Sequence, residues 1–386
     1  MKKITILVLG MFALGLDAYV IAGLIPALDT SFQVGISKIG QTVTVFTLCY
    51  ALSAPIFSTL LSGRPIRQIL LIAMAIFTLA NAASGLTHSF MGLLIARAFA
   101  GIGAGLFSPM AAAAAVSLVS NEKKGRAIGF ILGGMSTGTV IGVPLGLLIA
   151  QHSNWQYTFW FVTLLGILAL IGIYWQFPTF AAKTPPTLNE RIKMLTNYKI
   201  ARTVGISILA SISSLGLYTY LSPVVFDSIG VNFITPYLWA WGLGGIVGSF
   251  SIGFLIDYTG HPKALMAGIL LVMASSMLFL PSLLPYSILC FLPIFLWGAS
   301  GWSSLAPQQH TLLSIQPEHG AAAVALNSSA NYLGSAIGSA LGGLAIGFGL
   351  LPTNLPYAAG IVALVAAICQ LLIVMQKSQA SKLSAA

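Results

Sequence analysis

Twelve windows of apolar sequence, separated by short polar breaks, limit most strongly what this 386-residue chain can fold into. A helix needs about 20 mostly apolar residues to cross a bilayer, and each window has about that length or more. The breaks contain glycine, proline and asparagine, which form turns. The pattern therefore predicts an all-α membrane protein with twelve transmembrane helices. The predicted spans are 4–28, 38–61, 68–87, 90–117, 126–150, 157–177, 202–226, 231–256, 263–281, 284–314, 320–347 and 354–375.

The composition agrees with a chain that is surrounded mostly by lipid. Hydrophobic residues make up 57% of the chain and charged residues only 6%, whereas soluble domains contain about 25% charged residues. The formal net charge of +10 is carried by cations in the loops, so we expect no nucleic-acid partner. The three cysteines are scattered through apolar segments and no His/Cys cluster occurs. This pattern predicts neither a metal site nor a disulfide.

The lysines and arginines predict how the chain is oriented in the membrane. Of these 17 residues, 15 fall in termini or alternate loops on one side; Lys38 lies in an opposite loop and Arg97 lies within a span. The positive-inside rule then predicts that both termini are cytoplasmic, in the inner membrane of a bacterium. Lys2 and Lys3 precede an apolar run without a cleavage site. We therefore expect the N-terminal segment to be kept as the first span.

The longest polar break divides the chain into two similar halves of six spans each. Matching residues recur at a constant spacing: Glu122 and Glu318 are 196 residues apart, as are Gly142 and Gly338. Two parallel six-helix repeats around a site at the membrane midplane are a common architecture of secondary transporters. The predicted parts are an N-terminal half at 1–178, a central cytoplasmic loop at 179–200 and a C-terminal half at 201–386.

One carboxylate, Asp17, is predicted to lie inside the first span. At 1.5 Å of rise per residue it lies about 16 Å from the outer end of that helix, near the middle of the membrane. A charge there costs at least ~2.5–3.5 kcal/mol on insertion scales, so such residues usually have a function. The other six acidic residues lie in loops or at span ends. Asp17 is therefore a candidate proton or substrate site, and the best candidate for the proton carrier of a proton-coupled transporter; the alternative is a carboxylate that only holds helices together.

Three motifs elsewhere in the chain combine small residues with charges or a proline. Span four contains LIARAFAGIGAG, in which Arg97 precedes a series of glycines. Span five contains GGMSTGTVIGVPLG, in which Gly138, Gly142 and Gly146 recur every four residues. This spacing gives a small face for close helix contact, and Pro144 is expected to bend the helix and release a backbone carbonyl. The loop after span eight reads GFLIDYTGHPK.

Together with the acidic first span, these motifs resemble the major facilitator superfamily, in particular its twelve-span drug:proton antiporter branch. The resemblance covers both halves of the chain. It implies the fold of that superfamily, a pairing of Arg97 with Asp17, and an antiporter motif in span five. Val143 stands before the proline of this motif, as in arabinose-, nucleoside- and chloramphenicol-efflux relatives. The alternative for Arg97 is a purely structural role in the outer half of the bundle.

The resemblance also implies a cytoplasmic gate. Asp257 matches the aspartate of the family's loop motif after span eight, and Lys263 lies nearby. In the first half, Ser62 stands where the family has this aspartate. Arg64 and Arg67 would then contact helix C-termini or lipid headgroups instead. The alternative is that these charges only set the topology.

Aromatic and amide side chains within the spans are candidates for the wall of a substrate cavity. Such side chains suit amphipathic, weakly polar ligands, although each is also compatible with packing or lipid contact. Two of the candidates are asparagines four residues apart, on one face of a helix. The candidates are Tyr19, Phe46, Tyr50, Met135, Trp239, Asn327 and Asn331.

These features predict a secondary active transporter that exports a small organic solute or drug in exchange for protons, by alternating access. The alternative is a proton-independent facilitator, or an uptake symporter for a sugar or nucleoside. An enzyme is not expected, because the chain has no HExxH motif, no Ser/His/Asp set at a plausible depth and no nucleotide-binding loop. We expect no cofactor, and a monomer whose partners are lipid, protons and a small-molecule substrate.

Overall fold

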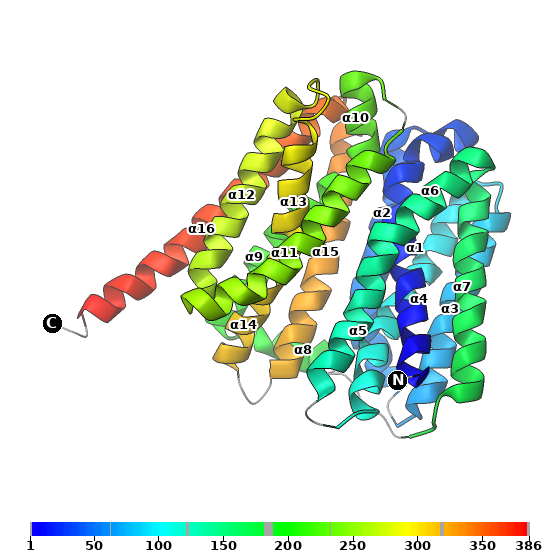
Figure 1. Ribbon diagram of the computed structural model, residues 1–386, viewed down its shortest axis with the longest axis horizontal. Coiled ribbons are helices and arrows are strands. Elements are labelled where there is room, and N and C mark those ends of the chain that lie inside the picture. The colour runs from blue at the N-terminus through cyan, green and yellow to red at the C-terminus, as the bar shows by residue number, and fades with distance from the viewer. Residues whose placement is uncertain are drawn as a thin grey trace. The chain divides into compact units, whose positions relative to one another are not determined.

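A computed structural model of the chain contains only helices as regular elements in the residues that it describes (Figure 1). The chain divides into two compact units, Met1–Glu190 and Arg191–Ala386. The predicted division at 1–178, 179–200 and 201–386 stays a prediction. The described residues are 2–61, 63–120, 123–180, 188–231, 233–316 and 320–383.

The first unit consists of six membrane-spanning segments. Five of them are single helices, and the fifth segment in chain order is divided by a short π-helix, η2. The elements are α1 (Lys2–Phe32), α2 (Ile36–Leu60), α3 (Ile66–Leu86), α4 (Phe90–Ser117), α5 (Lys124–Thr137), η2 (Gly138–Gly142), α6 (Val143–His152) and α7 (Trp155–Gln176).

A short helix, α8, contains the boundary between the two units, and the second unit continues with six further segments. Two of these segments are broken into pairs of shorter helices, α9 with α10 and α13 with α14. The elements are α8 (Leu188–Met194), α9 (Tyr198–Thr219), α10 (Leu221–Ile229), α11 (Thr235–Thr259), α12 (Pro262–Leu283), α13 (Phe291–Ser303), α14 (Leu305–Ile315), α15 (Gly320–Gly347), η3 (Pro352–Asn354) and α16 (Leu355–Leu383).

The apolar windows correspond to these segments. Among the described residues, ten segments are long and apolar enough to cross a membrane. The other two are the broken α13–α14 segment and α15, which is long but rich in glycine, serine and asparagine. The twelve-helix fold in two six-helix halves is confirmed.

Two windows predicted as single helices are broken in the structure. The first break is at Tyr220, between α9 and α10, and the second is at Ser304, between α13 and α14. A proline follows each break by three residues, Pro223 in one case and Pro307 in the other. Proline has no N–H to donate, so it is tolerated in the first turn of a new helix. Each break therefore lies one turn before the residue that cannot continue the helical hydrogen bonds.

A second difference concerns the central loop, which contains the short helix α8. Its Arg191 is buried, and its guanidinium donates to the carbonyl of Ala325 at 3.3 Å and to the hydroxyl of Ser329 at 2.8 Å. Burial lowers the pKa of Arg191 to about 10. Arg191 therefore ties α8 to α15 within the second unit.

Candidate ion-pair site

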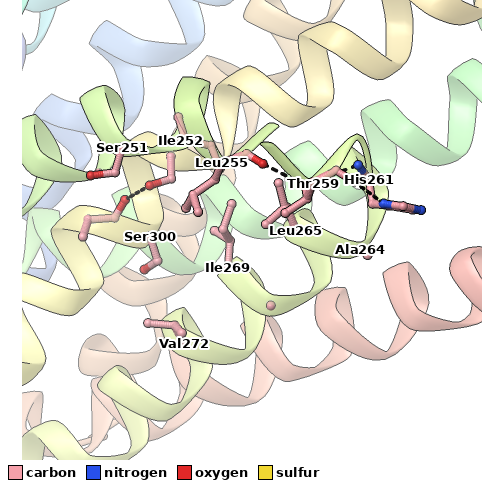
Figure 2. Close-up of a pocket in the computed structure, with 14 residues that line it drawn as sticks. Ser251, Ile252, Leu255, Thr259, His261, Ala264, Leu265, Ile269, Val272 and Ser300 are labelled. Carbon is pink, nitrogen blue, oxygen red and sulfur yellow. Dashed lines mark hydrogen bonds between the residues drawn. The ribbon is translucent and has the colours of Figure 1, made fainter. Parts of the chain in front are cut away.

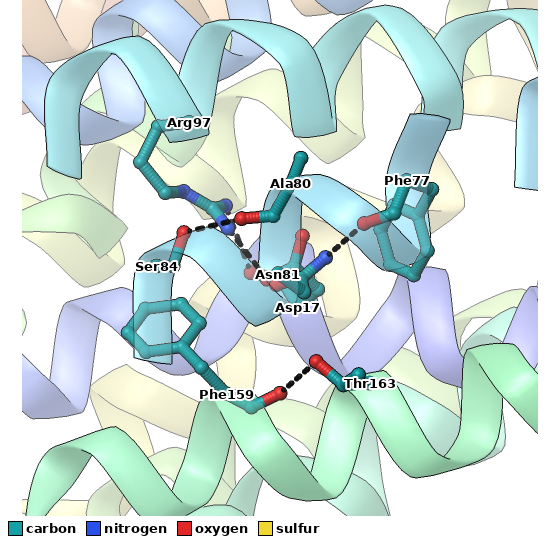
Figure 3. A network of polar contacts seen from close by, with 8 residues as sticks. All are labelled: Asp17, Phe77, Ala80, Asn81, Ser84, Arg97, Phe159 and Thr163. Atoms are coloured by element: carbon teal, nitrogen blue, oxygen red, sulfur yellow. Dashed lines mark hydrogen bonds and ion pairs between the residues drawn. The ribbon is translucent and has the colours of Figure 1, made fainter. Parts of the chain in front are cut away.

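The first unit contains a sealed ion pair between Asp17 of α1 and Arg97 of α4 (Figure 3). Nη1 of Arg97 lies 2.5 Å from Oδ1 of Asp17, and Nη2 donates to the main-chain oxygen of Asp17 at 3.3 Å. The side chain of Asp17 is 0% exposed and that of Arg97 is 1% exposed. The structure thus brings together the two residues that the sequence singled out, and their role in proton coupling stays a prediction.

Aromatic rings surround the cation of this pair. The guanidinium carbon of Arg97 lies 4.4 Å from the ring centroid of Phe46 on α2 and 5.7 Å from that of Phe159 on α7. Both rings are fully buried. A cation over an aromatic face is stabilised by the negative face of the ring, most strongly where water is excluded. Arg97 therefore contacts three other helices of the unit, α1, α2 and α7.

Asn81 of α3, which the sequence analysis did not select, lies beside Asp17 (Figure 3). It is fully buried and donates to the carbonyl of Phe77 at 3.0 Å. Three buried polar atoms at this site have no hydrogen-bond partner among the described residues: Asp17 Oδ2, Asn81 Oδ1 and Arg97 Nε. Buried polar atoms are nearly always paired in proteins. The described side chains therefore leave three hydrogen-bonding atoms unpaired around the ion pair.

The span-five motif holds the helix that carries Asp17. A β-carbon on Gly138 would overlap the main-chain oxygen of Phe12, and one on Gly142 would lie 3.0 Å from the β-carbon of Leu16. A β-carbon on Gly146 would lie 3.1 Å from a methyl group of the same leucine. Only glycine permits the approach at Gly138, so α1 is fixed against this segment immediately before Asp17.

The bend expected at Pro144 takes the form of the π-helix η2. The N–H of Val143 bonds the carbonyl of Gly138, five residues earlier. Pro144 follows at the start of α6 and lacks the N–H that an α-helix would direct at Val140. The wider turn thus accommodates the proline in an otherwise continuous segment.

The expected gate residues lie at the ends of helices. Arg67 donates to the carbonyl of Tyr174 in the last turn of α7, and its guanidinium lies 5.3 Å from the centroid of that ring. This is the expected contact with a helix C-terminus. Arg64 and Asp257 are exposed, while Lys263 is half-buried and its carbonyl accepts from the side chain of Gln370. Ser62 lies outside the described residues, and the gate stays a prediction.

The cavity candidates are divided between the two units. In the first unit, Phe46 and Tyr50 are buried, while Tyr19 and Met135 are half-buried. In the second unit, Asn327 is buried with Oδ1 unpaired among the described residues. Oδ1 of Asn331 accepts from the hydroxyl of Ser211 at 2.9 Å, and Trp239 is exposed. Their role in binding substrate stays a prediction.

The second unit repeats the framework of the site without its charges. Helices α1, α3 and α5 begin 196 residues before α9, α12 and α15. At this spacing Ser213 corresponds to Asp17 and Met277 to Asn81, and the hydroxyl of Ser213 donates to the sulfur of Met277 at 3.0 Å. Pro293 corresponds to Arg97. The ionic contact of the first unit thus has a neutral counterpart in the second.

A comparison with known families identifies this fold. The sequence model of the Major Facilitator Superfamily matches residues 7–316. The chain belongs to the major facilitator superfamily. It is therefore a multi-pass membrane protein that transports a small-molecule substrate, and the family consists of transporters rather than enzymes.

Similar proteins of this superfamily extend over most of the chain. The chain is 29% identical to the uncharacterized MFS-type transporter YbcL of Bacillus subtilis, over 89% of this chain and 88% of that protein. It is also 29% identical to a chloramphenicol resistance protein of Streptomyces lividans, over 69% of this chain and 70% of that protein. A crystal structure of a D-xylose-proton symporter covers 96% of both chains with a TM-score of 0.78 and 19% identity, which supports the fold.

Proposed function

We propose that this transporter exports a small organic solute or drug in exchange for protons, and that Asp17 carries the proton. The observation that carries this proposal is the buried contact of Asp17 with Arg97 inside a membrane-spanning bundle. Among the described residues, Asp17 is the only acidic residue that is buried. Intramembrane carboxylates of this kind commonly serve as proton relays in transporters.

Protonation would change the contact between α1 and α4. A proton on Asp17 removes the negative charge that the guanidinium of Arg97 pairs with. Arg97 then keeps its contact with the main-chain oxygen of Asp17 and with the two aromatic rings. The neutral carboxyl gains an O–H donor in a neighbourhood where Asn81 Oδ1 is an unpaired acceptor. The two protonation states therefore favour different arrangements of α1, α3 and α4, which is what coupling requires.

Export is supported by the span-five motif and by similarity to a chloramphenicol resistance protein. A specific observation also favours a second candidate, a facilitator or uptake symporter. The ion pair is sealed from solvent, as a purely structural pair would be, and a symporter shares the fold. We further propose that the protein is a monomer in a bacterial inner membrane, with both termini cytoplasmic as the loop cations indicate.

Transport in proteoliposomes with a pH dye in the lumen tests the proposal. The panel of solutes is chloramphenicol, purine nucleosides, arabinose and a lipophilic cation, each loaded inside. A solute that leaves by antiport acidifies the lumen, one that leaves by symport makes it alkaline, and facilitated exit leaves the pH unchanged. We expect acidification in wild type and none in Asp17→Asn.

A matched control uses Asp227→Asn, because Asp227 is an exposed carboxylate at the end of α10. This variant should acidify the lumen like wild type. Substrate exit without proton movement, equal in wild type and Asp17→Asn, would establish a facilitator and leave Asp17 a structural role. Alkalinisation on exit would establish a symporter.

A further inference from the structure

A column of aromatic rings covers Arg97 on the side of the membrane surface at which α1 ends. The ring centroid of Phe32, the last residue of α1, lies 5.5 Å from that of Trp155, the first residue of α7. The ring of Trp155 lies 5.9 Å from that of Phe159 and meets it at 87°. Phe159 in turn lies 5.7 Å from the guanidinium carbon of Arg97. The rings therefore form a continuous series of contacts from the helix ends to the ion pair.

The column passes from partly exposed to fully buried side chains. Phe32 is half-buried, as is Phe90 at the start of α4, whose ring centroid lies 6.3 Å from that of Phe32. The side chains of Trp155 and Phe159 are 4% and 0% exposed. At 1.5 Å of rise per residue, Phe159 lies about 6 Å inside the start of α7 and Arg97 about 10 Å inside the start of α4. The rings thus stand between Arg97 and this surface, which is the outer one in the proposed orientation.

A hydrogen bond to α1 fixes the orientation of the Trp155 ring. Its indole N–H donates to the hydroxyl of Ser31 at 2.8 Å, and this hydroxyl donates in turn to the carbonyl of Ala27 at 2.9 Å. Ser31 is exposed, so water can replace it as the acceptor when the ring turns outward. A tryptophan combines a large apolar ring with one N–H donor, which suits a position between an apolar interior and water. Outward rotation of Trp155 therefore costs ring contacts but leaves no donor unpaired.

The corresponding helix start of the second unit carries aliphatic and small side chains instead. Helix α16 takes the place of α7 as the last span, and it begins with Leu355 and has Ala359 one turn later. The second unit also has no buried acidic side chain among its described residues. A groove of about 560 Å³ lies between its helices α11 and α12, and the residues that line this groove all belong to the second unit (Figure 2). The aromatic column thus accompanies the buried carboxylate of the first unit rather than the fold.

We propose that Trp155 is a gate that admits water, and with it protons, to Asp17 from the outer surface. In the closed position its ring lies between Phe32 and Phe159 and keeps its hydrogen bond to α1, as the structure shows. In the open position the ring turns toward the surface, and water reaches the guanidinium of Arg97 and the carboxylate behind it. The entry of protons rests on the proposed function, whereas the entry of water does not.

The reaction of a buried reporter cysteine with a charged thiol reagent tests the gate. Ser84 of α3 belongs to the polar network around the ion pair and is fully buried (Figure 3). The parent protein carries Ser84→Cys, and its three native cysteines are replaced by alanine. The membrane-impermeant reagent sulfonatoethyl methanethiosulfonate is added to the outer side of right-side-out vesicles, and mass spectrometry measures the rate of modification. We expect Trp155→Ala to raise this rate about tenfold, which corresponds to about 1.4 kcal/mol of closure.

Trp175→Ala is the matched control, because Trp175 is an exposed tryptophan at the opposite end of the same helix. It should leave the rate unchanged. Ser31→Ala removes only the hydrogen bond and keeps the ring contacts, so it should raise the rate by less than Trp155→Ala does. Modification from the inner side, measured in inside-out vesicles, should be the same in all variants.

An unchanged rate in a Trp155→Ala protein that melts at the parent temperature would overturn the gate. So would an equal rise in the rate on both sides of the membrane, because that result would indicate a loosened bundle. If Trp155→Ala melts early, Ser31→Ala decides, since it removes only one exposed hydroxyl. An unchanged rate in that variant would then overturn the gate.

Proton entry is tested separately, by the collapse of an imposed pH gradient in proteoliposomes without solute. Trp155→Ala should collapse the gradient faster than wild type, because a protein whose outer side does not close passes protons whenever its inner side opens. Asp17→Asn in the same protein should remove the increase. A faster collapse that persists in this double variant, together with the expected modification from the outer side, would retain the gate and overturn Asp17 as the proton carrier.

Discussion

At the scale of single residues, the first unit encloses a pair of opposite charges, and loss of either partner alone is expected to destabilise the protein. Asp17 and Arg97 are both almost completely buried. Removal of one partner from a buried pair leaves an uncompensated charge, which costs about 3–5 kcal/mol in soluble proteins. Removal of both leaves polar groups without net charge. The order of stabilities among single and double variants therefore reports whether the pair is ionised.

We predict that Arg97→Gln lowers the melting temperature more than Asp17→Asn/Arg97→Gln does. The single variant strands a carboxylate among apolar side chains, and the double variant does not. Thermal unfolding of purified protein in one detergent measures the order. The exposed Arg64→Gln serves as the control for loss of a cation and should melt like wild type. A double variant no more stable than Arg97→Gln would show that loss of Arg97 leaves no stranded charge on Asp17.

At the scale of helices, the close contact between α1 and the α5–η2–α6 segment depends on glycines, which have no β-carbon. Gly138 lies against the main-chain oxygen of Phe12. In contrast, Gly133 on the same segment is exposed and has no atom near the position of a β-carbon. The two glycines therefore allow one methyl group to be tested in two environments.

We predict that Gly138→Ala destabilises the protein by about 1–3 kcal/mol, as overpacking does in tight cores. It should also reduce transport, because α1 has to shift and carries Asp17 with it. Gly133→Ala should stabilise the helix by about 0.5–1 kcal/mol through the lower conformational freedom of alanine. Melting temperature and initial transport rate measure both effects. Equal behaviour of the two variants would mean that α1 is not held at Gly138.

The helices themselves were predictable from the sequence, and their breaks were not. Apolar windows mark each span because lipid requires long apolar helices. Proline alone does not mark a break: Pro26, Pro55 and Pro109 lie inside continuous helices. Whether a helix breaks at proline depends on the neighbours that satisfy the released carbonyl, and these neighbours come from distant parts of the chain.

The candidate site, like the helices, was predictable from the sequence only in part. The family resemblance implied the pairing of Arg97 with Asp17, and the position of both residues within spans agrees with it, because charges in lipid have few other partners. Depth does not reveal which sides of the helices meet. The contribution of Asn81 and Phe159 to the site is therefore seen only in the structure. An asparagine within an apolar span could nevertheless have marked Asn81 as a candidate site residue. The spacing of 196 residues relates Ser213 to Asp17 and Met277 to Asn81, but the contact between Ser213 and Met277 is visible only in the structure.

At the scale of the whole molecule, the two units are related in sequence but unequal in chemistry. The spacing of 196 residues relates both the glycine faces and the helices that they contact. Gly138 approaches Phe12 in the first unit, and Gly334 approaches Ile208 in the second. The counterpart of Asp17 is nevertheless the neutral Ser213. If Asp17 carries the proton, the second unit has no equivalent carrier among its described residues.

This inequality predicts the exchange of one proton for each molecule of solute. At zero membrane potential, a gradient of one pH unit should then balance about a tenfold gradient of a neutral solute, since one pH unit is about 1.4 kcal/mol per proton. Two protons would balance about a hundredfold gradient. The solute ratio at which net flux stops, measured in proteoliposomes with the potential clamped by potassium and valinomycin, distinguishes the two. A hundredfold balance would require a second proton-binding group outside the Asp17 site. Exchange of a single proton for a neutral solute moves one uncompensated charge across the membrane in each cycle. A tenfold solute ratio at balance that also shifts with the clamped potential would show this charge movement.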